Sequence, residues 1–261
     1  QERNETLFIM LNKIFIMGAS TGIGKALAIH YSNKNIILGL AARRLDLLEK
    51  VALECQNNNA TVHIFKVDVR KKKTCIYAAN KFIELANGID LVIANSGIAG
   101  KDNLFSGDSK YVNKILNTNI LGVTNTILPF LPTMKDQGYG IIAGISSIAS
   151  FLPLPNRGGY SSSKVAIRRL FDSFRPILKE YGIKTITICP GFIDTPMTEK
   201  MTFKPFLKDS NNAAKAFAKA IEKGKKTYIY PWQMSWLIKL TRLIPQKIVN
   251  WFLGIVKYNQ H

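Results

Sequence analysis

Residues 13–24 read Lys-Ile-Phe-Ile-Met-Gly-Ala-Ser-Thr-Gly-Ile-Gly, an apolar run followed by a turn with glycine at positions 18, 22 and 24. The apolar run predicts a buried strand, and the pattern that begins at Ile23 predicts a helix. Glycines allow a tight turn and a close approach of backbone to a phosphate, and a helix N-terminus favours negative charge. The spacing differs from the commonest dinucleotide fingerprint, so a purely structural turn stays an alternative for this stretch by itself.

Short apolar runs alternate with longer amphipathic segments along the chain. This alternation predicts a parallel sheet with helices on both faces, because continuous apolar runs suit strands that are buried on both sides. The length of 261 residues, of which 47% are hydrophobic, suits one α/β domain. We therefore expect a single Rossmann-type, doubly wound domain over 10–261 with seven parallel strands. The expected strands are 13–17, 35–40, 61–67, 90–94, 140–146, 184–189 and 227–230, and the expected helices are 23–32, 45–56, 71–87, 110–135, 160–180 and 211–223.

The first nine residues fit poorly with a domain whose first strand lies just after residue 12. Met10 is a candidate for the natural start, and we read 1–9 as a remnant of cloning and leave it out of the fold. The apolar run 7–11 is too short to direct secretion or to cross a membrane.

A second informative stretch is Tyr160-Ser161-Ser162-Ser163-Lys164. On a helix, residues four apart lie on one face, so the Lys164 ammonium can lie close to the Tyr160 phenol. A nearby cation lowers the pKa of a phenol from its usual value of about 10. A tyrosine with a lowered pKa can exchange a proton with a carbonyl or hydroxyl group near neutral pH.

Together these stretches resemble the short-chain dehydrogenase/reductase family, and the resemblance runs from about residue 13 to about residue 230. Two positions depart from the family pattern: Met17 stands where Thr is frequent, and Ser96 stands where Ala is usual. Both replacements are conservative in size. The ordered motifs are Gly18-x-x-x-Gly22-x-Gly24, Asp68-Val69, Asn95-Ser96-Gly97, Asn119, Ser147, Tyr160 with Lys164, and Pro190-Gly191 with Thr195.

The resemblance implies an enzyme that transfers a hydride between a nicotinamide cofactor and a carbonyl/alcohol pair. It implies that Ser147 donates a hydrogen bond to the substrate oxygen and that Tyr160 exchanges the proton. Lys164 would lower the pKa of Tyr160 and hold the nicotinamide ribose, and Asn119 would anchor a water that leads to Lys164. Alternatives stay open: Ser147 as a nucleophile, although no His lies in a triad-like motif, and Asn119 as a helix cap. A cofactor-binding regulatory or scaffold protein without turnover is the rival function.

The resemblance also implies a set of cofactor-binding residues. Asp68 would meet the adenine amino group, Asn95 to Gly97 would approach the adenosine ribose, and Thr195 would hold the nicotinamide carboxamide. The expected set is Gly18, Ser20, Thr21, Gly22, Ile23, Gly24, Arg43, Asp68, Val69, Asn95, Gly97, Tyr160, Lys164, Pro190, Gly191, Ile193 and Thr195.

The second expected strand ends in Ala41-Ala42-Arg43-Arg44. A site selective for NAD would place a carboxylate here to bind the ribose 2′-hydroxyl. Ala42 has none, and the Arg43 guanidinium can pair with a 2′-phosphate. The sequence therefore predicts NADP rather than NAD, with a solvated helix start as the alternative for the two arginines.

Composition limits the classes of partner and the cellular compartment that we expect for this protein. The chain has 36 Lys and Arg against 17 Asp and Glu, a net charge of +19. The basic runs 70–73 and 223–226 are not interleaved with aromatics, which favours a solvated basic surface over nucleic-acid binding. Three cysteines without paired spacing indicate the reducing cytoplasm, and three scattered histidines give no metal-ligand spacing.

The segment 192–210 resembles the substrate lid of the family. It carries Met197, Met201, Phe203, Phe206 and Leu207. Methionines and aromatics suit adaptable apolar contacts, so we expect a bulky or long apolar carbonyl substrate. Packing of these side chains on the core is the alternative.

The C-terminal segment 232–261 predicts an amphipathic helical extension. Its apolar residues recur at helical spacing, but its charges and Pro245 break it too often for a membrane-spanning helix. A basic amphipathic segment with Trp can lie in a membrane interface on the cytoplasmic face, cover an oligomer interface or cover the substrate mouth. We expect a homo-oligomer, either a dimer or a tetramer. The apolar positions are Trp236, Leu237, Leu240, Leu243, Ile244, Ile248, Val249, Phe252, Ile255 and Val256, and the basic ones are Lys239, Arg242, Lys247 and Lys257.

Overall fold

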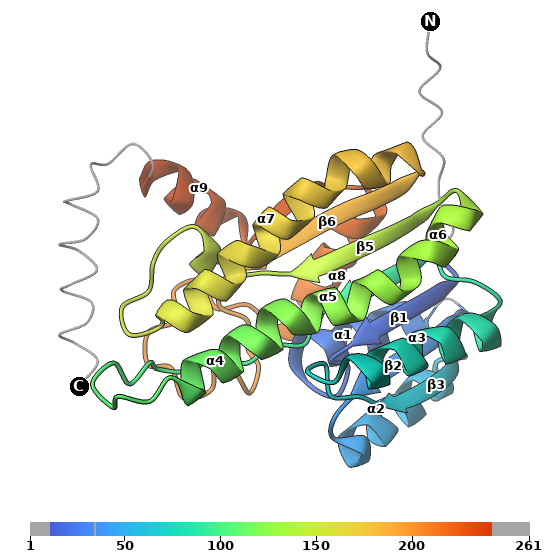
Figure 1. Ribbon diagram of the computed structural model, residues 1–261, viewed down its shortest axis with the longest axis horizontal. Helices are drawn as coiled ribbons and strands as arrows, with labels where there is room; N and C mark the ends of the chain where they lie inside the picture. The colour runs from blue at the N-terminus through green and yellow to red at the C-terminus, as the bar shows by residue number, and fades with distance from the viewer. Residues whose placement is uncertain (1–10, 34, 242–261) are drawn as a thin grey trace, which may run out of the picture.

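The computed structural model describes residues 11–33 and 35–241. Seven parallel strands form one sheet in the order β3-β2-β1-β4-β5-β6-β7 (Figure 1). The chain builds outward from β1 to one edge, then returns to the middle at β4 and builds toward the other edge. This is the doubly wound arrangement that the alternating pattern predicts. The strands are β1 Lys13–Met17, β2 Ile37–Ala42, β3 Thr61–Lys66, β4 Leu91–Ala94, β5 Gly140–Ile145, β6 Ile183–Pro190 and β7 Thr227–Tyr230.

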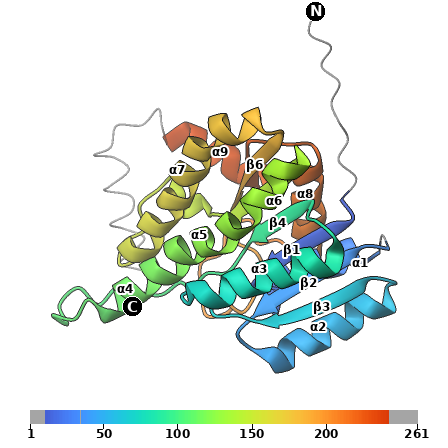
Figure 2. The same cartoon turned by 45° about the vertical axis from the view of Figure 1, so that its right-hand side comes forward.

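Helices cover both faces of the sheet (Figures 1 and 2). The core of one face is shared with α1 (Gly22–Ser32), α2 (Leu45–Asn57) and α8 (Ser210–Glu222). The core of the other face is shared with α3 (Lys72–Ala86), α5 (Gly122–Ile127) and α7 (Gly158–Glu180). The remaining α-helices are α4 (Lys110–Leu116), α6 (Leu131–Gln137) and α9 (Trp232–Thr241).

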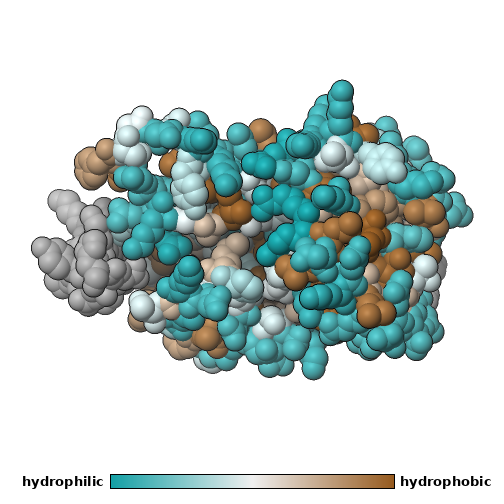
Figure 3. Space-filling model, turned by 90° about the horizontal axis from the view of Figure 1, so that it is seen from below, coloured by the Kyte–Doolittle hydropathy of each residue, from teal (hydrophilic) through white to brown (hydrophobic). Residues whose placement is uncertain are grey.

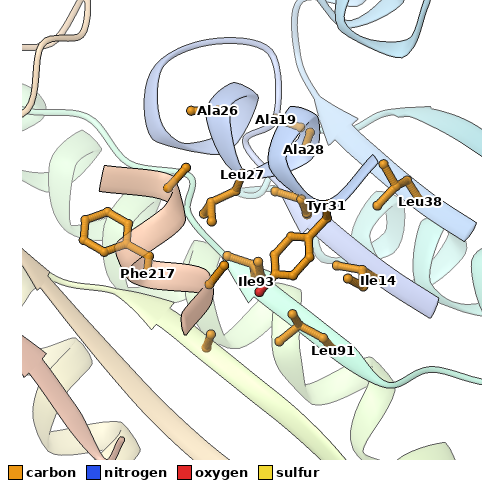
Figure 4. Packing of buried hydrophobic residues seen from close by; sticks show 14 of the residues in the cluster. Ile14, Ala19, Ala26, Leu27, Ala28, Tyr31, Leu38, Leu91, Ile93 and Phe217 are labelled. Carbon is orange, nitrogen blue, oxygen red and sulfur yellow. The ribbon is translucent and has the colours of Figure 1, made fainter. Parts of the chain in front are cut away.

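The central strand β1 sends alternate side chains into the two cores, as the period of two in a strand requires. Ile14 packs on one face together with Leu91 of β4 and Tyr31 of α1 (Figure 4). Phe15 packs on the other face, where its ring lies 5.4 Å from that of Phe82 and 4.9 Å from that of Phe130. Because both faces are buried, the strand reads as a continuous apolar run.

The helix expected over 110–135 is interrupted, which corrects the sequence prediction. A π-helical turn, η1 (Asn117–Leu121), follows α4, and a 3-10 turn, η2 (Leu128–Phe130), follows α5. Pro129 and Pro132 lack the N–H that a continuous helix needs. The π-helical turn contains Asn119, and such turns are frequent at functional sites.

The three cysteines are free and buried. No helix among residues 11–33 and 35–241 is both long enough and apolar enough to cross a membrane. The part of the expected C-terminal extension that follows Thr241 lies outside the described residues.

Candidate active site

The glycine-rich turn lies between β1 and α1, at the carboxyl edge of the sheet. Gly18 and Gly22 have φ values of 86° and 59°, a left-handed conformation that glycine adopts without strain. At Gly24, a Cβ would lie 2.2 Å from the Gly18 carbonyl oxygen, so only glycine lets α1 pack onto the turn. The Asn95 side chain donates to the same carbonyl at 2.9 Å, which fixes the end of β4 to the turn.

A hollow opens beside this turn and the N-terminus of α1. The helix N-terminus supplies backbone N–H groups that favour an anion. The lining combines the turn with the ends of β2, β3 and β4 and with part of the segment after β6. The lining residues are Gly18, Ser20, Thr21, Gly22, Ile23, Ala42, Arg43, Arg44, Val67, Val69, Asn95, Ser96, Gly97, Ile98, Thr118, Thr195, Pro196 and Met197.

The two arginines after β2 make different contacts. Arg44 donates from Nη2 to the Thr21 hydroxyl at 2.9 Å and to the Ser20 hydroxyl at 3.4 Å, so it is fixed to the glycine-rich turn. Arg43 is exposed on the rim of the same hollow. Arg44 was not in the set expected from the sequence, and its position next to Arg43 was the only signal for it.

Asp68 follows β3 and pairs with Arg70. The Arg70 Nε lies 3.0 Å from Oδ1 of Asp68, and these hydrogen bonds lower the pKa of Asp68 to about 2. The positive charge of Arg43 contributes to the lowered pKa, which places that guanidinium near the carboxylate. Val67 and Val69 line the hollow on either side of Asp68.

Ser147 lies directly after the end of β5. Its Oγ accepts a hydrogen bond of 3.1 Å from the Ala149 backbone, which begins the 3-10 turn η3 (Ile148–Ser150). Ser147 also forms a hydrogen bond with Tyr160, so the two hydroxyl groups lie together. The neighbouring Ser146 donates to the Lys164 carbonyl at 2.8 Å and serves the packing of α7 on the sheet.

The pKa of Tyr160 moves in the opposite direction from the one expected. Burial raises this pKa above its usual value, while the hydrogen bond with Ser147 and the charge of Arg157 oppose the rise. The Lys164 ammonium lies 5.6 Å from the centre of the Tyr160 ring and donates to the Ile145 carbonyl at 3.0 Å. Burial lowers the pKa of Lys164 itself to about 8.

Asn119 is fully buried and braces the site from the π-helical turn. Its Nδ2 donates to the Ile98 carbonyl at 2.9 Å and to the Ser163 hydroxyl at 3.0 Å. Its Oδ1 accepts from the Ile98 N–H at 2.8 Å. Ser163 in turn donates to the Tyr160 carbonyl. Asn119 therefore joins the loop after β4 to the helix that carries Tyr160, and its side chain does not act as a helix cap.

Gly97 connects the hollow with the polar cluster on α7. A Cβ on Gly97 would lie 3.5 Å from the Lys164 ammonium and 3.3 Å from the Asn119 oxygen. Gly97 also lines the hollow, so it lies between the hollow and Lys164.

The segment after β6 contributes Thr195 to the lining, and a Cβ on Gly22 would lie 3.2 Å from the Thr195 methyl group. The other expected residues of this segment lie elsewhere. Gly191 donates to the Tyr230 carbonyl at 2.7 Å, Ile193 is buried in the core, and Pro190 ends β6.

The family model for short chain dehydrogenases matches residues 12–205, which is most of the chain. The chain belongs to the short-chain dehydrogenase/reductase family. An uncharacterized oxidoreductase of Myxococcus xanthus is 30% identical over 236 residues, which cover 90% of this chain and 93% of the relative. This family assignment confirms the resemblance seen in the sequence and makes the protein an oxidoreductase.

Two solved structures of the family share this fold. An alcohol dehydrogenase of Thermococcus sibiricus, complexed with 5-hydroxy-NADP, is 28% identical with a TM-score of 0.75 and covers 84% of this chain and 95% of its own. A short-chain dehydrogenase/reductase of Burkholderia phymatum, in complex with NAD, is 20% identical with a TM-score of 0.81. The match covers 88% of this chain and 92% of that structure's chain. The family thus includes members with either type of dinucleotide.

Sequence reasoning missed the residues that hold this short-chain dehydrogenase/reductase site in place. Ile145 contributes a backbone carbonyl, which no side-chain pattern reveals. Asp102 accepts from the Gly159 N–H at 3.1 Å at the start of α7, one residue before Tyr160, although 57 residues separate the two in sequence. Ser163 lay inside the quoted Tyr160–Lys164 stretch, but only the fold brings it to Asn119.

Proposed function

We propose that the protein interconverts a carbonyl and an alcohol on an apolar substrate with NADP(H), and that Tyr160 is the acid/base. The observation that carries this proposal is the position of Gly97, which lines a hollow rimmed by two arginines and lies beside the buried ammonium of Lys164. A binding pocket and a group of proton-exchanging side chains are thereby adjacent.

The hollow fits a nicotinamide dinucleotide. Gly18, Gly22 and the N-terminus of α1 would hold the pyrophosphate, because this backbone is open to close approach and favours negative charge. Thr195 lines the hollow and would hold the nicotinamide end. When bound, the cofactor supplies or accepts the hydride.

The protein's own residues handle the proton. Ser147 would donate a hydrogen bond to the substrate oxygen, since its hydroxyl keeps a proton to donate while its Oγ accepts from Ala149. Tyr160 would give the proton in reduction and take it in oxidation. Its raised pKa keeps the phenol protonated before substrate reduction. The Lys164 ammonium, 5.6 Å from the centre of the Tyr160 ring, would stabilise the phenolate that remains. Asn119 is a positioning residue, because it holds α7 through Ser163.

The choice of NADP rests on the end of β2. Ala42 supplies no carboxylate for a ribose 2′-hydroxyl, and Arg43 is exposed on the rim of the hollow with its guanidinium near Asp68. A guanidinium in this place can pair with a 2′-phosphate.

An apolar substrate follows from the segment 192–210, which we propose as the lid. Phe203 and Phe206 are exposed, and Met197 is exposed while it also lines the hollow. This exposure favours contact with a substrate over packing on the core.

We also propose peripheral membrane contact through 232–261, a cytoplasmic location and a homo-oligomer. The exposed Trp232 and Trp236 of α9 support the membrane contact, and the free, buried cysteines suit a reducing compartment. Exposed apolar side chains on the 3-10 turn η2 and on α7, among them Leu128 and Val165, support self-association.

NADPH oxidation with a panel of steroid, retinoid, fatty-acyl and quinone carbonyls tests the proposed function. The expected result is turnover with at least one large apolar class, together with tighter binding of NADPH than of NADH by fluorescence titration. Tight NADPH binding without turnover of any class, in either direction, would instead support the regulatory alternative.

A further inference from the structure

Apolar side chains are exposed at one end of the molecule in an unusual concentration. Among the described residues, the exposed Phe and Trp side chains are Phe105, Phe203, Phe206, Trp232 and Trp236. Phe105 is 100% exposed, and the two tryptophans are 67% and 65% exposed. The face seen from below is covered largely by hydrophilic residues with separate apolar patches (Figure 3). A soluble monomer rarely leaves large aromatic side chains exposed as a group.

These five side chains belong to three segments that leave the carboxyl edge of the sheet, after β4, β6 and β7. In Figure 1 the loop before α4 and helix α9 both lie on the left-hand side of the molecule, the loop below and α9 above. We call these side chains, with Leu104, Leu207, Leu237 and Leu240, the apolar rim.

The segments that carry the apolar rim are tied to the site through other residues of the same segments. The loop with Phe105 also carries Asp102, which accepts from Gly159 next to Tyr160. The segment with Phe203 and Phe206 carries Thr195, which lines the hollow. Helix α9 reaches the base of the same segment, where a Cβ on Gly191 would lie 3.1 Å from Met234. The rim therefore lies on segments that also build or brace the site.

The chemistry of the rim points to a lipid surface. Tryptophan and basic residues together are typical of the membrane interface, and the Lys239 ammonium lies 5.4 Å from the centre of the Trp236 ring. The sequence from Pro231 to His261 holds four basic and no acidic residues, in a chain of net charge +19. This charge favours an anionic bilayer. Helix α9 has 10 residues, so it suits a position on the surface of a bilayer.

We propose that the apolar rim docks on an anionic lipid surface, so that the substrate mouth faces the bilayer. The substrate is then a carbonyl or alcohol dissolved in the lipid, which enters the site without crossing water. This inference rests on the proposed function for the substrate step, whereas the docking itself does not require turnover.

Co-sedimentation with vesicles tests the docking. The full chain is mixed with vesicles of phosphatidylcholine alone or with about a third phosphatidylserine, at low and high salt. We expect binding to the anionic vesicles that weakens at high salt. The double variant Phe105→Ser/Trp236→Ser should bind the anionic vesicles at least about tenfold more weakly than the wild type, since it removes two large apolar side chains from the interface. The control is Tyr77→Ser, an equally exposed aromatic on α3, which should bind like the wild type.

Thermal melts establish that the variants are folded, and size-exclusion chromatography identifies the alternative occupant. If the wild type binds neither kind of vesicle, the proposal is wrong. If the double variant then also changes its oligomeric state, the rim binds a second copy. If the double variant binds the anionic vesicles as tightly as the wild type and the control do, the rim is not the docking surface.

A second readout separates docking from catalysis. Turnover is compared for a substrate embedded in anionic vesicles and for a short, water-soluble analogue of it. The double variant should lose rate on the embedded substrate and keep its rate on the soluble one. Equal loss on both would overturn delivery from the bilayer, whereas absence of turnover by vesicle-bound wild type would count against the proposed function only.

Discussion

Arg43 and Arg44 are adjacent in sequence but differ in what holds them. Arg44 is bonded to two hydroxyl groups of the glycine-rich turn, whereas Arg43 is exposed on the rim of the hollow. Arg43 makes no hydrogen bond to the turn, so we propose Arg43 and not Arg44 as the partner of a 2′-phosphate. The sequence predicted Arg43 for the 2′-phosphate, but the different contacts of the two arginines depend on side-chain geometry that adjacent positions cannot reveal.

Substitution of each arginine should therefore affect the cofactors differently. Arg43→Ala should weaken NADPH binding by about 1.5–3 kcal/mol, the range of a hydrogen bond to a charged group, and leave NADH nearly unchanged. Arg44→Ala should weaken both dinucleotides, because it loosens the turn around Thr21. Calorimetric titration of the two variants checks this. A selective loss of NADPH in Arg44→Ala instead of Arg43→Ala would reassign the 2′-phosphate site.

Lys164 should make stability depend on alkaline pH. Its pKa is about 8 in the folded protein against 10.5 ordinarily, so between these values the unfolded chain binds more protons and stability rises with pH. Below pH 8 the buried ammonium is charged and its burial costs stability. Lys164→Met removes this dependence, so the Tm advantage of the variant at pH 7 should shrink by several °C toward pH 10. A constant Tm difference over this range would contradict the lowered pKa.

At the scale of elements, the start of α7 decides where Tyr160 lies. Asp102 accepts from the second residue of the helix and brings a negative charge to its N-terminus, where the helix dipole favours it. A Cβ on Gly158 or Gly159 would lie 3.2 or 3.3 Å from the Asp102 carboxylate, which accounts for two glycines before Tyr160. The glycines were visible in the sequence, but their partner was not.

Asp102→Ala should lower both stability and turnover. We expect a loss of about 0.5–2 kcal/mol in the free energy of unfolding, as for a lost helix cap, with kcat reduced more than NADPH affinity. Asp108→Ala is the matched control, because Asp108 accepts from Lys110 at the start of α4 at 2.7 Å. That variant should lose stability without losing kcat. Equal kcat in the two variants would mean that Asp102 does not position Tyr160.

The interrupted helix between β4 and β5 shows a limit of pattern reading. The apolar spacing over 110–135 continues through four changes of helix type, because it reports which face is buried and not how the backbone is hydrogen-bonded. The two prolines could have indicated the 3-10 turn, but nothing in the pattern indicates the π-helical turn at Asn119.

At the scale of the whole molecule, the sheet was predictable because its strands are buried on both sides. All seven expected strands form within a few residues of the expected limits, and their order follows from the doubly wound pattern. The places of the glycine-rich turn, Ser147, and Tyr160 with Lys164 were predictable from short motifs, and their roles stay predictions. The site was not predictable where it depends on distant backbone groups. The Ile145 carbonyl, for example, accepts from the Lys164 ammonium and so helps to fix its position.

The basic charge and the apolar rim also belong to this scale. They concern how the whole protein approaches a surface, whereas the fold concerns how the chain packs on itself. Only the first part of the C-terminal extension, α9, is described, and its exposed Trp face is the feature that the amphipathic pattern predicts.

The central claim is that Tyr160 exchanges the proton in a hydride-transfer reaction. The most direct measurement compares Tyr160→Phe with the wild type and with Tyr77→Phe, a control on the exposed face of α3. The account predicts that Tyr160→Phe lowers kcat by about 10²-fold or more, as for loss of a general acid–base, with little change in NADPH binding. Tyr77→Phe should match the wild type. Near-normal turnover by Tyr160→Phe would contradict the account.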